Sequence, residues 1–200
     1  MSEVKDRILA ATRATVLAEG YAALSMRKVA ASAGVPLSQI HYHFGSKEQL
    51  VLATLLAEDA RLLHRQQSLY AGDEPLSVQW RRACDYLDED LESGYVRILH
   101  ELTAAGWSND SVKAELLRLL EGWREVLTEG FGSAAGRGVD FGPLTVEQVV
   151  ALVAAAFIGA ESMILSRQEN AAMPVRAALR AVGDVLEAAE NRATATEVPS

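Results

Sequence analysis

The sequence predicts an all-α protein of about nine helices, and three observations carry this prediction. Apolar residues recur at spacings of three and four along most of the chain, and no strictly alternating pattern competes with them. Glycine and proline interrupt the periodic stretches, as they do between Gly72 and Pro75 and at Gly94. Half of the 200 residues are apolar, which is enough for one or two compact domains.

Residues 25–47 have the sequence form of a helix-turn-helix. Ser25 can cap a short helix, because its hydroxyl can accept a hydrogen bond from a free backbone N–H of the first turn. Gly34 can take the left-handed conformation that ends this helix, and Pro36 has the fixed φ that suits the start of the next. Ser46 fits the first position of a capping box, so a third helix is expected to begin there.

The second helix of this motif carries side chains that suit DNA recognition. Polar and aromatic residues that can hydrogen-bond or stack, and that are largely uncharged, occupy its outer positions; they are Ser38, Gln39, His41, Tyr42 and His43. A helix-turn-helix lays its second helix in the major groove, where such groups can contact base edges. An αα-hairpin that merely packs has the same spacing, so the motif by itself leaves both interpretations open.

The stretch from Ile8 to about Leu52 resembles the N-terminal domain of the TetR family of bacterial transcriptional regulators. The matching residues are Ile8-Leu9-Ala10-Ala11, Gly20-Tyr21, Ser25-x-Arg27-x-Val29-Ala30, Ala33-Gly34-Val35, Ile40-x-Tyr42-x-Phe44 and Ser46-Lys47-Glu48-x-Leu50. The combination is specific, although each piece alone is weak. It favours a DNA-binding regulator over a hairpin that merely packs.

The resemblance implies a three-helix DNA-binding domain over residues 1–46 and a larger helical domain over 47–191 that binds a ligand and dimerises. The composition of the last residues predicts a flexible tail at 192–200. It also implies that Arg27 and the exposed side of the second motif helix contact bases. The full set of expected DNA contacts is Ser25, Arg27, Leu37, Ser38, Gln39, His41, Tyr42, His43 and Lys47. Within this set, the phosphate contacts would come from Ser25, Tyr42 and Lys47.

Two positions depart from the family pattern. Pro36 stands where the reading helix often begins with Ser or Thr, and His41 stands where a Tyr often precedes the last aromatic pair. These differences bear on the detailed contacts and not on the presence of the domain.

Charge is distributed unevenly along the chain. The formal net charge is −8, yet residues 1–48 hold six Lys or Arg against four acidic residues, whereas the remaining 152 hold 13 against 23. Because attraction to phosphate is local, a mildly basic head on an acidic body can still bind DNA. So few basic residues predict weak binding by one head and favour two heads acting together.

The rest of the chain predicts further helices. Their expected spans are 46–70, 76–91, from 95 to at least 102, from 109 or 110 to 127, 145–168 and 174–191. Residues 130–144 are rich in glycine and are expected to form a mobile loop.

The aromatic residues of the second domain have two possible roles. Core packing is the ordinary one, whereas the resemblance implies that several line an apolar pocket for an aromatic or aliphatic effector. The residues expected near this pocket are Trp80, Cys84, Leu87, Trp123, Leu127 and Phe157, with His100 and Glu161 as polar anchors. Glu161 can equally be a solvated or interface residue.

The helix expected over 145–168 is apolar on more than one face. One surface can pack on its own domain while another meets a second subunit, although a central core helix of a monomer has the same composition. The resemblance implies that this helix and the last one form a four-helix dimer interface. The residues expected there are Val149, Val153, Phe157, Ala160, Ile164, Leu179, Val182 and Leu186.

Several other classes of protein and site have little support in the sequence. The single cysteine, Cys84, excludes an intrachain disulfide, and the charged start of the chain and the lack of a run of about 18 apolar residues argue against secretion and a membrane span. Gly130–Gly136 lacks the preceding strand of a dinucleotide loop. No metal site, cofactor or catalytic set is expected, so the sequence does not predict an enzyme.

These patterns together predict a cytoplasmic, homodimeric repressor that a small hydrophobic ligand releases from an inverted-repeat operator in double-stranded DNA. The alternative is a helical protein that binds a small molecule and has no specific DNA binding. Salt dependence separates the two, because a true DNA-binding protein loses affinity steeply as salt rises.

Overall fold

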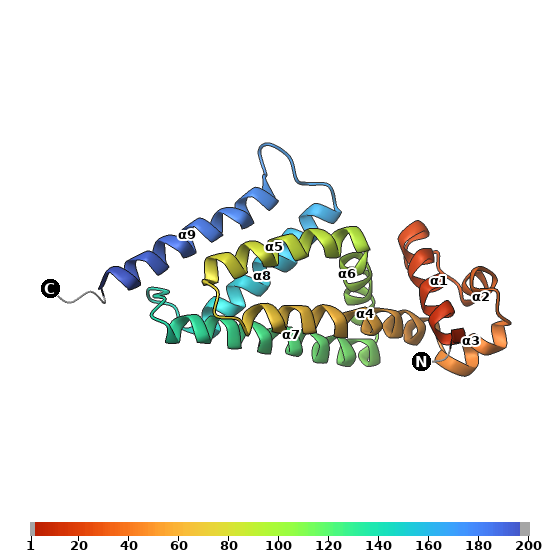
Figure 1. Cartoon of the computed structure of the whole chain (residues 1–200). Helices are drawn as coiled ribbons and strands as arrows, with labels where there is room; N and C mark the ends of the chain where they lie inside the picture. Colours follow the sequence, from red (N-terminus) through yellow and green to blue (C-terminus); the bar gives the residue numbers. More distant parts are fainter. Residues whose placement is uncertain (1–2, 197–200) are drawn as a thin grey trace. The chain divides into compact units, whose positions relative to one another are not determined.

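The computed structural model describes residues 3–196 and their side chains as far as residue 192, and this part of the chain is all-α (Figure 1). The helices are α1 (Glu3–Glu19), α2 (Met26–Ala33), α3 (Leu37–Phe44), α4 (Lys47–Tyr70), α5 (Leu76–Ser93), α6 (Tyr95–Gly106), α7 (Asp110–Gly136), α8 (Val146–Leu165) and α9 (Val175–Thr196). The described residues contain no strand; they contain one isolated bridge, between Asn170 and Met173. The predicted fold class is confirmed.

The chain forms two compact units. Unit 1 comprises the residues up to Leu62 together with Asp90–Leu120, and unit 2 comprises Leu63–Glu89 together with the residues from Glu121 onward. The predicted boundary between residues 46 and 47 falls inside unit 1.

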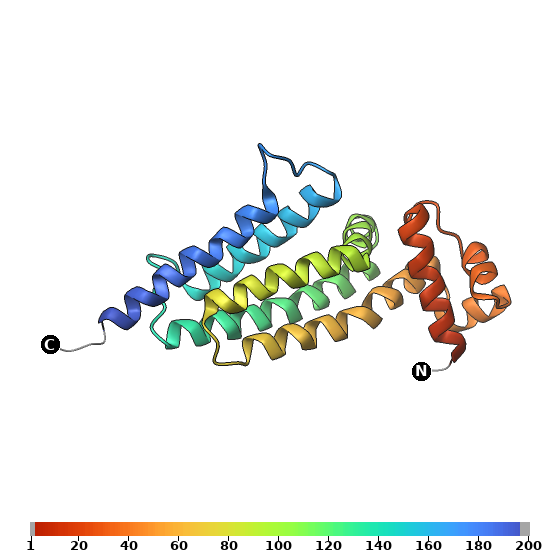
Figure 2. The ribbon, with the colours of Figure 1, turned by 45° about the horizontal axis from the view of Figure 1, so that its top comes forward.

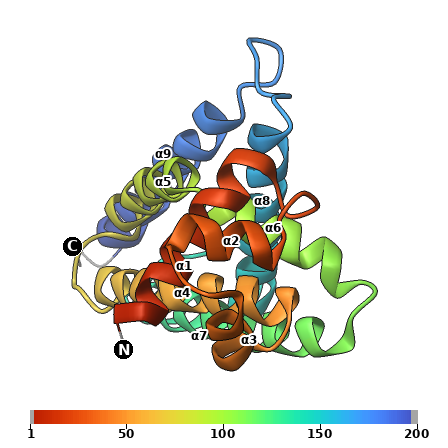
Figure 3. The ribbon, with the colours of Figure 1, turned by 90° about the vertical axis from the view of Figure 1, so that its right-hand side faces the viewer.

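In unit 1, α1 packs against α2, and α2 packs against α3, to form the helix-turn-helix head (Figure 3). Its core consists of apolar side chains that are fully buried: Ile8, Val16, Val29, Ile40 and Leu50. Each lies on the apolar face of its helix, so the head is specified by simple helical periodicity.

Helix α6 also belongs to unit 1 and is bonded to α1. The Arg97 Nη1 donates to the Leu17 carbonyl at 2.8 Å, and the Tyr21 backbone N–H donates to the Glu101 carboxylate. Gly94, which separates α5 from α6, has φ +83°, and a Cβ there would lie 2.0 Å from the Leu17 Cδ2. Only glycine therefore permits both this turn and this close approach.

In unit 2, the second half of α4 packs between α5 and α7. A Cβ on Gly122 would lie 3.2 Å from Leu63, and one on Gly130 would lie 2.5 Å from the Tyr70 ring, so α4 and α7 run parallel here. Helix α5 runs antiparallel to α4, because Arg65 stacks 3.9 Å from the Tyr86 ring centroid while Gln79 bonds to the end of α4.

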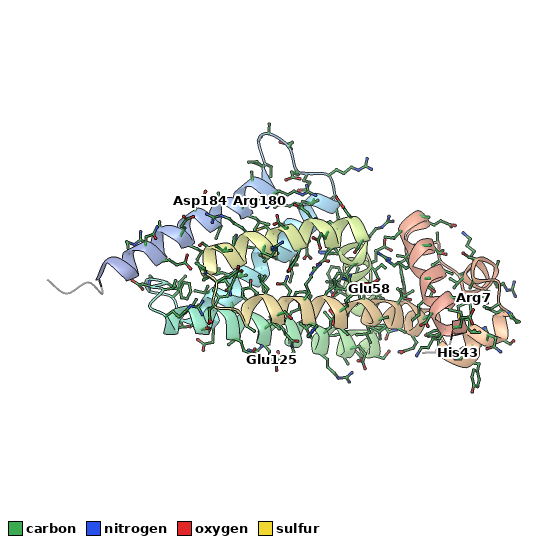
Figure 4. All side chains as sticks on the ribbon, viewed as in Figure 1. Arg7, His43, Glu58, Glu125, Arg180 and Asp184 are labelled. Carbon is green, nitrogen blue, oxygen red and sulfur yellow. The ribbon has the colours of Figure 1, made fainter. Side chains whose placement is uncertain are left out.

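Ion pairs hold helix α9 to α5. Figure 2 shows the path of α9, and Figure 4 labels Arg180 and Asp184 on it. Arg81 of α5 lies 2.9 Å from Asp184, whereas Arg180 of α9 lies 2.7 Å from Asp85 and 2.8 Å from Asp88. The sign of the charge on each helix thus reverses along the contact, which fixes the register of α9 on α5. Apolar contacts add to it through the buried Leu179 and Leu186.

Two sequence-based expectations need correction. Residues 130–144 are not one loop: α7 continues to Gly136, with Phe131 and Ala134 buried. Gly130 serves close packing against Tyr70 rather than flexibility. Helix α9 extends to Thr196 instead of ending near residue 191, and residues 197–200 of the predicted tail lie outside the described part.

A further observation concerns membrane-length segments. Helix α8 is long and apolar enough to cross a bilayer by length and composition, with mean hydropathy 1.9 over an 18-residue window of which 11% is buried. A core or interface helix of a soluble protein passes the same test, so this feature alone is weak evidence of a membrane span.

Candidate nucleic-acid interface and ligand site

The turn of the helix-turn-helix has well-defined caps. The Ser25 hydroxyl accepts from the Lys28 backbone N–H at 3.3 Å and so caps α2. Gly34 is left-handed, with φ 62° and ψ 40°, and the Val35 N–H donates to the Ala30 carbonyl at 3.0 Å. These bonds form the glycine-terminated helix end that the sequence predicts.

An arginine from α1 also closes this turn (Figure 4). The Arg7 Nη2 donates to the Ala33 carbonyl at 2.5 Å and to the Gly34 carbonyl at 3.1 Å. These are carbonyls at the end of α2, which the helix itself cannot satisfy. Sequence reasoning did not identify this contact, because nothing local to Arg7 indicates a partner 26 residues away.

Helix α3 separates its buried and exposed faces cleanly. Ile40 and Phe44 are buried, whereas Ser38, Gln39 and Tyr42 are exposed, with Tyr42 at 82% of its maximum. Pro36 provides no side-chain cap to this helix. A large aromatic side chain held almost fully in solvent on a short helix suits contact with a partner.

The other residues of α3 that are predicted to contact DNA are partly buried or lie close to groups within the head. Leu37 and His43 are half-buried, and the His43 ring lies 5.1 Å from that of Tyr42 and 6.0 Å from that of Phe44. The exposed His41 ring lies with its Nδ1 3.3 Å from the Gly45 carbonyl oxygen. His43 therefore packs against the rings of Tyr42 and Phe44, and only part of its side chain is open to a partner.

The cations of the head differ in their surroundings. Arg27 is exposed, whereas Lys28 pairs with Glu19. The Lys47 Nζ lies 4.4 Å from the centroid of the Tyr21 ring and 3.5 Å from the Ala22 carbonyl oxygen. Burial, followed by the charge of Glu48, raises the pKa of the Tyr21 hydroxyl, so this ring stays neutral beside Lys47.

In unit 2, three of the residues predicted near a ligand are buried on α5: Trp80, Cys84 and Leu87. The Trp80 Nε1 donates to the Leu179 carbonyl at 2.7 Å, and its ring centroid lies 5.4 Å from that of Phe157. Trp123, Leu127, Phe157 and Glu161 are half-buried. His100 belongs to unit 1, unlike the other seven residues of the predicted set.

Cys84 is inert by its surroundings. It is 4% exposed, and burial raises the pKa of its thiol to about 11. A thiol in that state is neither a nucleophile nor a ready metal ligand near neutral pH. Within the described residues, no group of three or more His, Cys, Asp or Glu is placed to hold a metal ion.

The residues predicted at a dimer interface on α8 and α9 differ in their exposure within the single chain. Four residues expected at a dimer interface are buried within the single chain and offer little of their own surface to a second copy; they are Val149, Ala160, Leu179 and Leu186. Val153, Phe157 and Ile164 are half-buried, and only Val182 of the set is exposed. Apolar side chains on other faces of the two helices are open to solvent instead: Leu152, Ile158 and Val185 at 59%, 46% and 66%.

Comparison with known proteins bears on the head and on the fold. Residues 8–54 match the family model described as bacterial regulatory proteins of the TetR family. No curated protein matches the sequence significantly.

Solved structures resemble nearly the whole chain. A TetR transcription regulator from Haloarcula marismortui has a TM-score of 0.78 at 18% identity, covering 93% of this chain and 97% of that one. A regulator from Saccharomonospora viridis in complex with choline has 0.76 at 18%, covering 94% and 97%. FadR from Bacillus subtilis, in complex with stearoyl-CoA, has 0.74 at 16%, covering 90% and 96%. At these identities the likeness establishes the fold.

Proposed function

Because residues 8–54 form the DNA-binding domain of the TetR family of bacterial regulatory proteins, we propose that this regulator is a homodimeric repressor released from DNA by a small molecule. The observation that carries the proposal is the head itself. A capped and clamped helix-turn-helix turn supports a short helix whose outer face is exposed and polar or aromatic. That arrangement suits insertion into the major groove.

The proposed DNA contacts divide by chemistry. Ser38, Gln39 and Tyr42 extend from the exposed side of α3, and Arg27 extends from α2. We assign Arg27 and the other exposed side chains of α3 to bases, and Ser25, Tyr42 and Lys47 to phosphates. Because phosphate contacts position a protein while base contacts specify the sequence, the two groups should respond differently to salt.

Dimerisation is proposed through α8 and α9. The exposed residues Leu152, Ile158, Val182 and Val185 are the support for it, because apolar side chains gathered on two neighbouring helices are stabilised when a second surface covers them. Two-fold symmetry then implies an inverted-repeat operator, with half-sites about 34–36 Å apart or a multiple of that distance. Covering α8 from two sides also accounts for its apolar character in a cytoplasmic protein.

The effector is proposed to bind in unit 2 among α4, α5, α7 and α8. Relatives of the same fold are seen with choline and with stearoyl-CoA, so this architecture accommodates small molecules of different kinds. A coupling of about 1–3 kcal/mol between effector and operator is enough to release DNA. No catalytic step is part of the proposal.

Selection of bound fragments from a genomic DNA pool tests the function. Purified protein at moderate salt and with excess competitor should enrich an inverted repeat, and binding should weaken steeply as salt rises. A folded dimer that enriches no sequence would instead support a ligand-binding protein without specific DNA binding, for which the net charge of −8 is the supporting observation.

A further inference from the structure

Two glutamines are buried in unit 2, and they differ in what they bond to. Gln79 is fully buried, and its Nε2 donates to the Leu69 carbonyl at 3.1 Å and to the Gly72 carbonyl at 3.0 Å. Both acceptors lie at the end of α4, where carbonyls lack partners within the helix. Gln79 therefore has a structural role as a side-chain cap, and these two bonds fix its amide with the Oε1 also buried and without a hydrogen-bond partner.

Gln66 has no such role. It is 8% exposed, and its Oε1 is buried without a hydrogen-bond partner. Leaving a buried polar group unsatisfied destabilises a fold, and a leucine at the same place would avoid this. The two bonds from its amide nitrogen account for the burial of Gln79, whose oxygen is also unpartnered, but no side-chain bond accounts for the burial of Gln66. A buried amide of this second kind indicates a partner from outside the chain.

Packing places Gln66 at the level of the proposed effector site. It lies on the buried stripe of α4 one turn from Leu62 and one turn from Tyr70, both of which are buried. Since Leu63 is opposite Gly122 and Tyr70 is opposite Gly130, the parallel helix α7 presents its residues near 126 at this level. Val126 is buried there, and Trp123 and Leu127 flank it.

The contacts with the antiparallel helix α5 also place Gln66 at the level of the proposed effector site. The Arg65 guanidinium stacks on the ring of Tyr86, and its Nη1 lies 2.9 Å from the Glu89 carboxylate. The next residue of α4, Gln66, is therefore level with the turns of α5 that carry Cys84 and Leu87. These two side chains are buried and lie on the apolar side of α5.

We propose that Gln66 is the polar anchor of the effector site, and that the effector is an apolar molecule bearing an O–H or N–H donor for the Gln66 Oε1. The surroundings require an apolar body, because the residues of unit 2 placed near this level, Tyr70, Leu87 and Val126, are buried and apolar or aromatic. The anchor requires a donor, because an acceptor-only group facing Oε1 would leave both oxygens unsatisfied. This inference rests on the proposed function, since it concerns the effector site of that regulator.

The first test is thermal unfolding of the ligand-free protein. Gln66→Leu should raise the Tm by about 2–4 °C, because it removes an unsatisfied buried amide. The matched variant Gln79→Leu should lower the Tm, because it removes two bonds to carbonyls that remain buried at the end of α4. A fall in Tm for Gln66→Leu comparable with that for Gln79→Leu would mean that Gln66 has a structural partner, and would overturn the proposal.

The second test measures ligand preference. Straight-chain alcohols of six to twelve carbons are titrated against wild-type protein, followed by methyl ethers of the same length, with tryptophan fluorescence or calorimetry as the readout. The two series match in apolar surface, but only the alcohols can donate. Wild type should bind the best alcohol about tenfold more tightly than its ether, as one hydrogen bond to a buried acceptor implies.

In Gln66→Leu this preference should disappear, with both series binding alike. Equal affinities in wild type, an unchanged preference in Gln66→Leu, or no binding of either series would each overturn the inference. If an ordered water satisfied the Gln66 Oε1, wild type would bind the alcohols and the ethers with equal affinity. The titrations contain no DNA, so failure of the inference is distinguishable from failure of the proposed function, which the fragment selection tests separately.

Discussion

The bonds from Arg7 to the end of α2 predict that this arginine supports DNA binding by positioning the turn and not by contacting DNA itself. Arg7→Met retains an apolar stem of similar length and removes the donors to the Ala33 and Gly34 carbonyls. One of the two bonds is partly buried and the other is exposed. Bonds from charged groups contribute about 1.5–3 kcal/mol when well buried, so we expect a loss of about 1–2 kcal/mol here.

That loss has a defined effect on DNA binding. It lowers the ratio of closed to open turns by about 5- to 30-fold, and only the closed turn holds α3 at the angle that the groove requires. The apparent Kd per head therefore rises by up to this factor, and the two altered heads of a dimer together lower operator affinity by up to its square, about 25- to 900-fold. Dimer mass should not change, because Arg7 is on α1 of unit 1.

Salt dependence distinguishes the two possible roles of Arg7. Operator affinity is measured by fluorescence anisotropy across a range of salt concentrations for wild type, Arg7→Met and the matched control Lys47→Met. Lys47 is proposed to contact a phosphate, so the slope of log K against log salt should fall by about one for each head in Lys47→Met. In Arg7→Met the affinity should fall while the slope stays at the wild-type value. A reduced slope in Arg7→Met would mean that Arg7 contacts phosphate, and unchanged affinity would mean that the turn does not need the clamp; either result refutes the reasoning.

Three further expectations follow from packing, exposure and burial. Gly94→Ala should destabilise the protein in urea by about 1–2 kcal/mol for the positive φ and about 1–3 kcal/mol for the clash with Leu17, and adding Leu17→Ala should recover only the second part. Leu152→Asp should convert dimer to monomer in light scattering, whereas Leu117→Asp, at an equally exposed leucine of α7, should leave the mass unchanged. Cys84 should resist thiol reagents at pH 8 in the native state. Because burial raises the pKa of its thiol from 9.0 to about 11, the thiol of the unfolded chain loses its proton between pH 9 and 11 while that of the folded chain keeps it. The free energy of unfolding should therefore fall as pH rises from 9 to 11, and this part of the fall should be absent in Cys84→Ala.

The head was predictable because its specifying interactions are local. Ser25, Gly34 and Ser46 each act within four residues of their own position, through a cap or a turn. Helical periodicity then assigns Ile40 and Phe44 to the interior and leaves the other face of α3 outside. Fold class and the candidate DNA surface follow from such short-range rules.

The errors come from contacts that are distant in sequence. Gly130 and its neighbours have the composition of a flexible loop, but close packing against Tyr70, 60 residues earlier, makes them helical. The sequence likewise gives no sign that Arg7 reaches the end of α2, or that Gln66 and Gln79 differ in their partners. Local patterns identify which residues can form a helix, and only the tertiary structure decides what each face meets.

The dimer surface is an instructive case of this limit. Periodicity assigns a buried face when one side of a helix is apolar, but α8 is apolar on several sides, so its sequence identifies the helix and not the face. For α9, the ion pairs with α5 determine which face is covered and which face is exposed. It directs Arg180 and Asp184 toward α5 and leaves Val182 and Val185 in solvent, the reverse of what an isolated surface helix would favour. A bilayer covering these valines would also approach the ion pairs beside them, at a large desolvation cost. A second copy of the chain can cover the valines and Leu152 while the ion pairs stay at the polar rim, which is the physical argument for the proposed dimer over a membrane-bound arrangement.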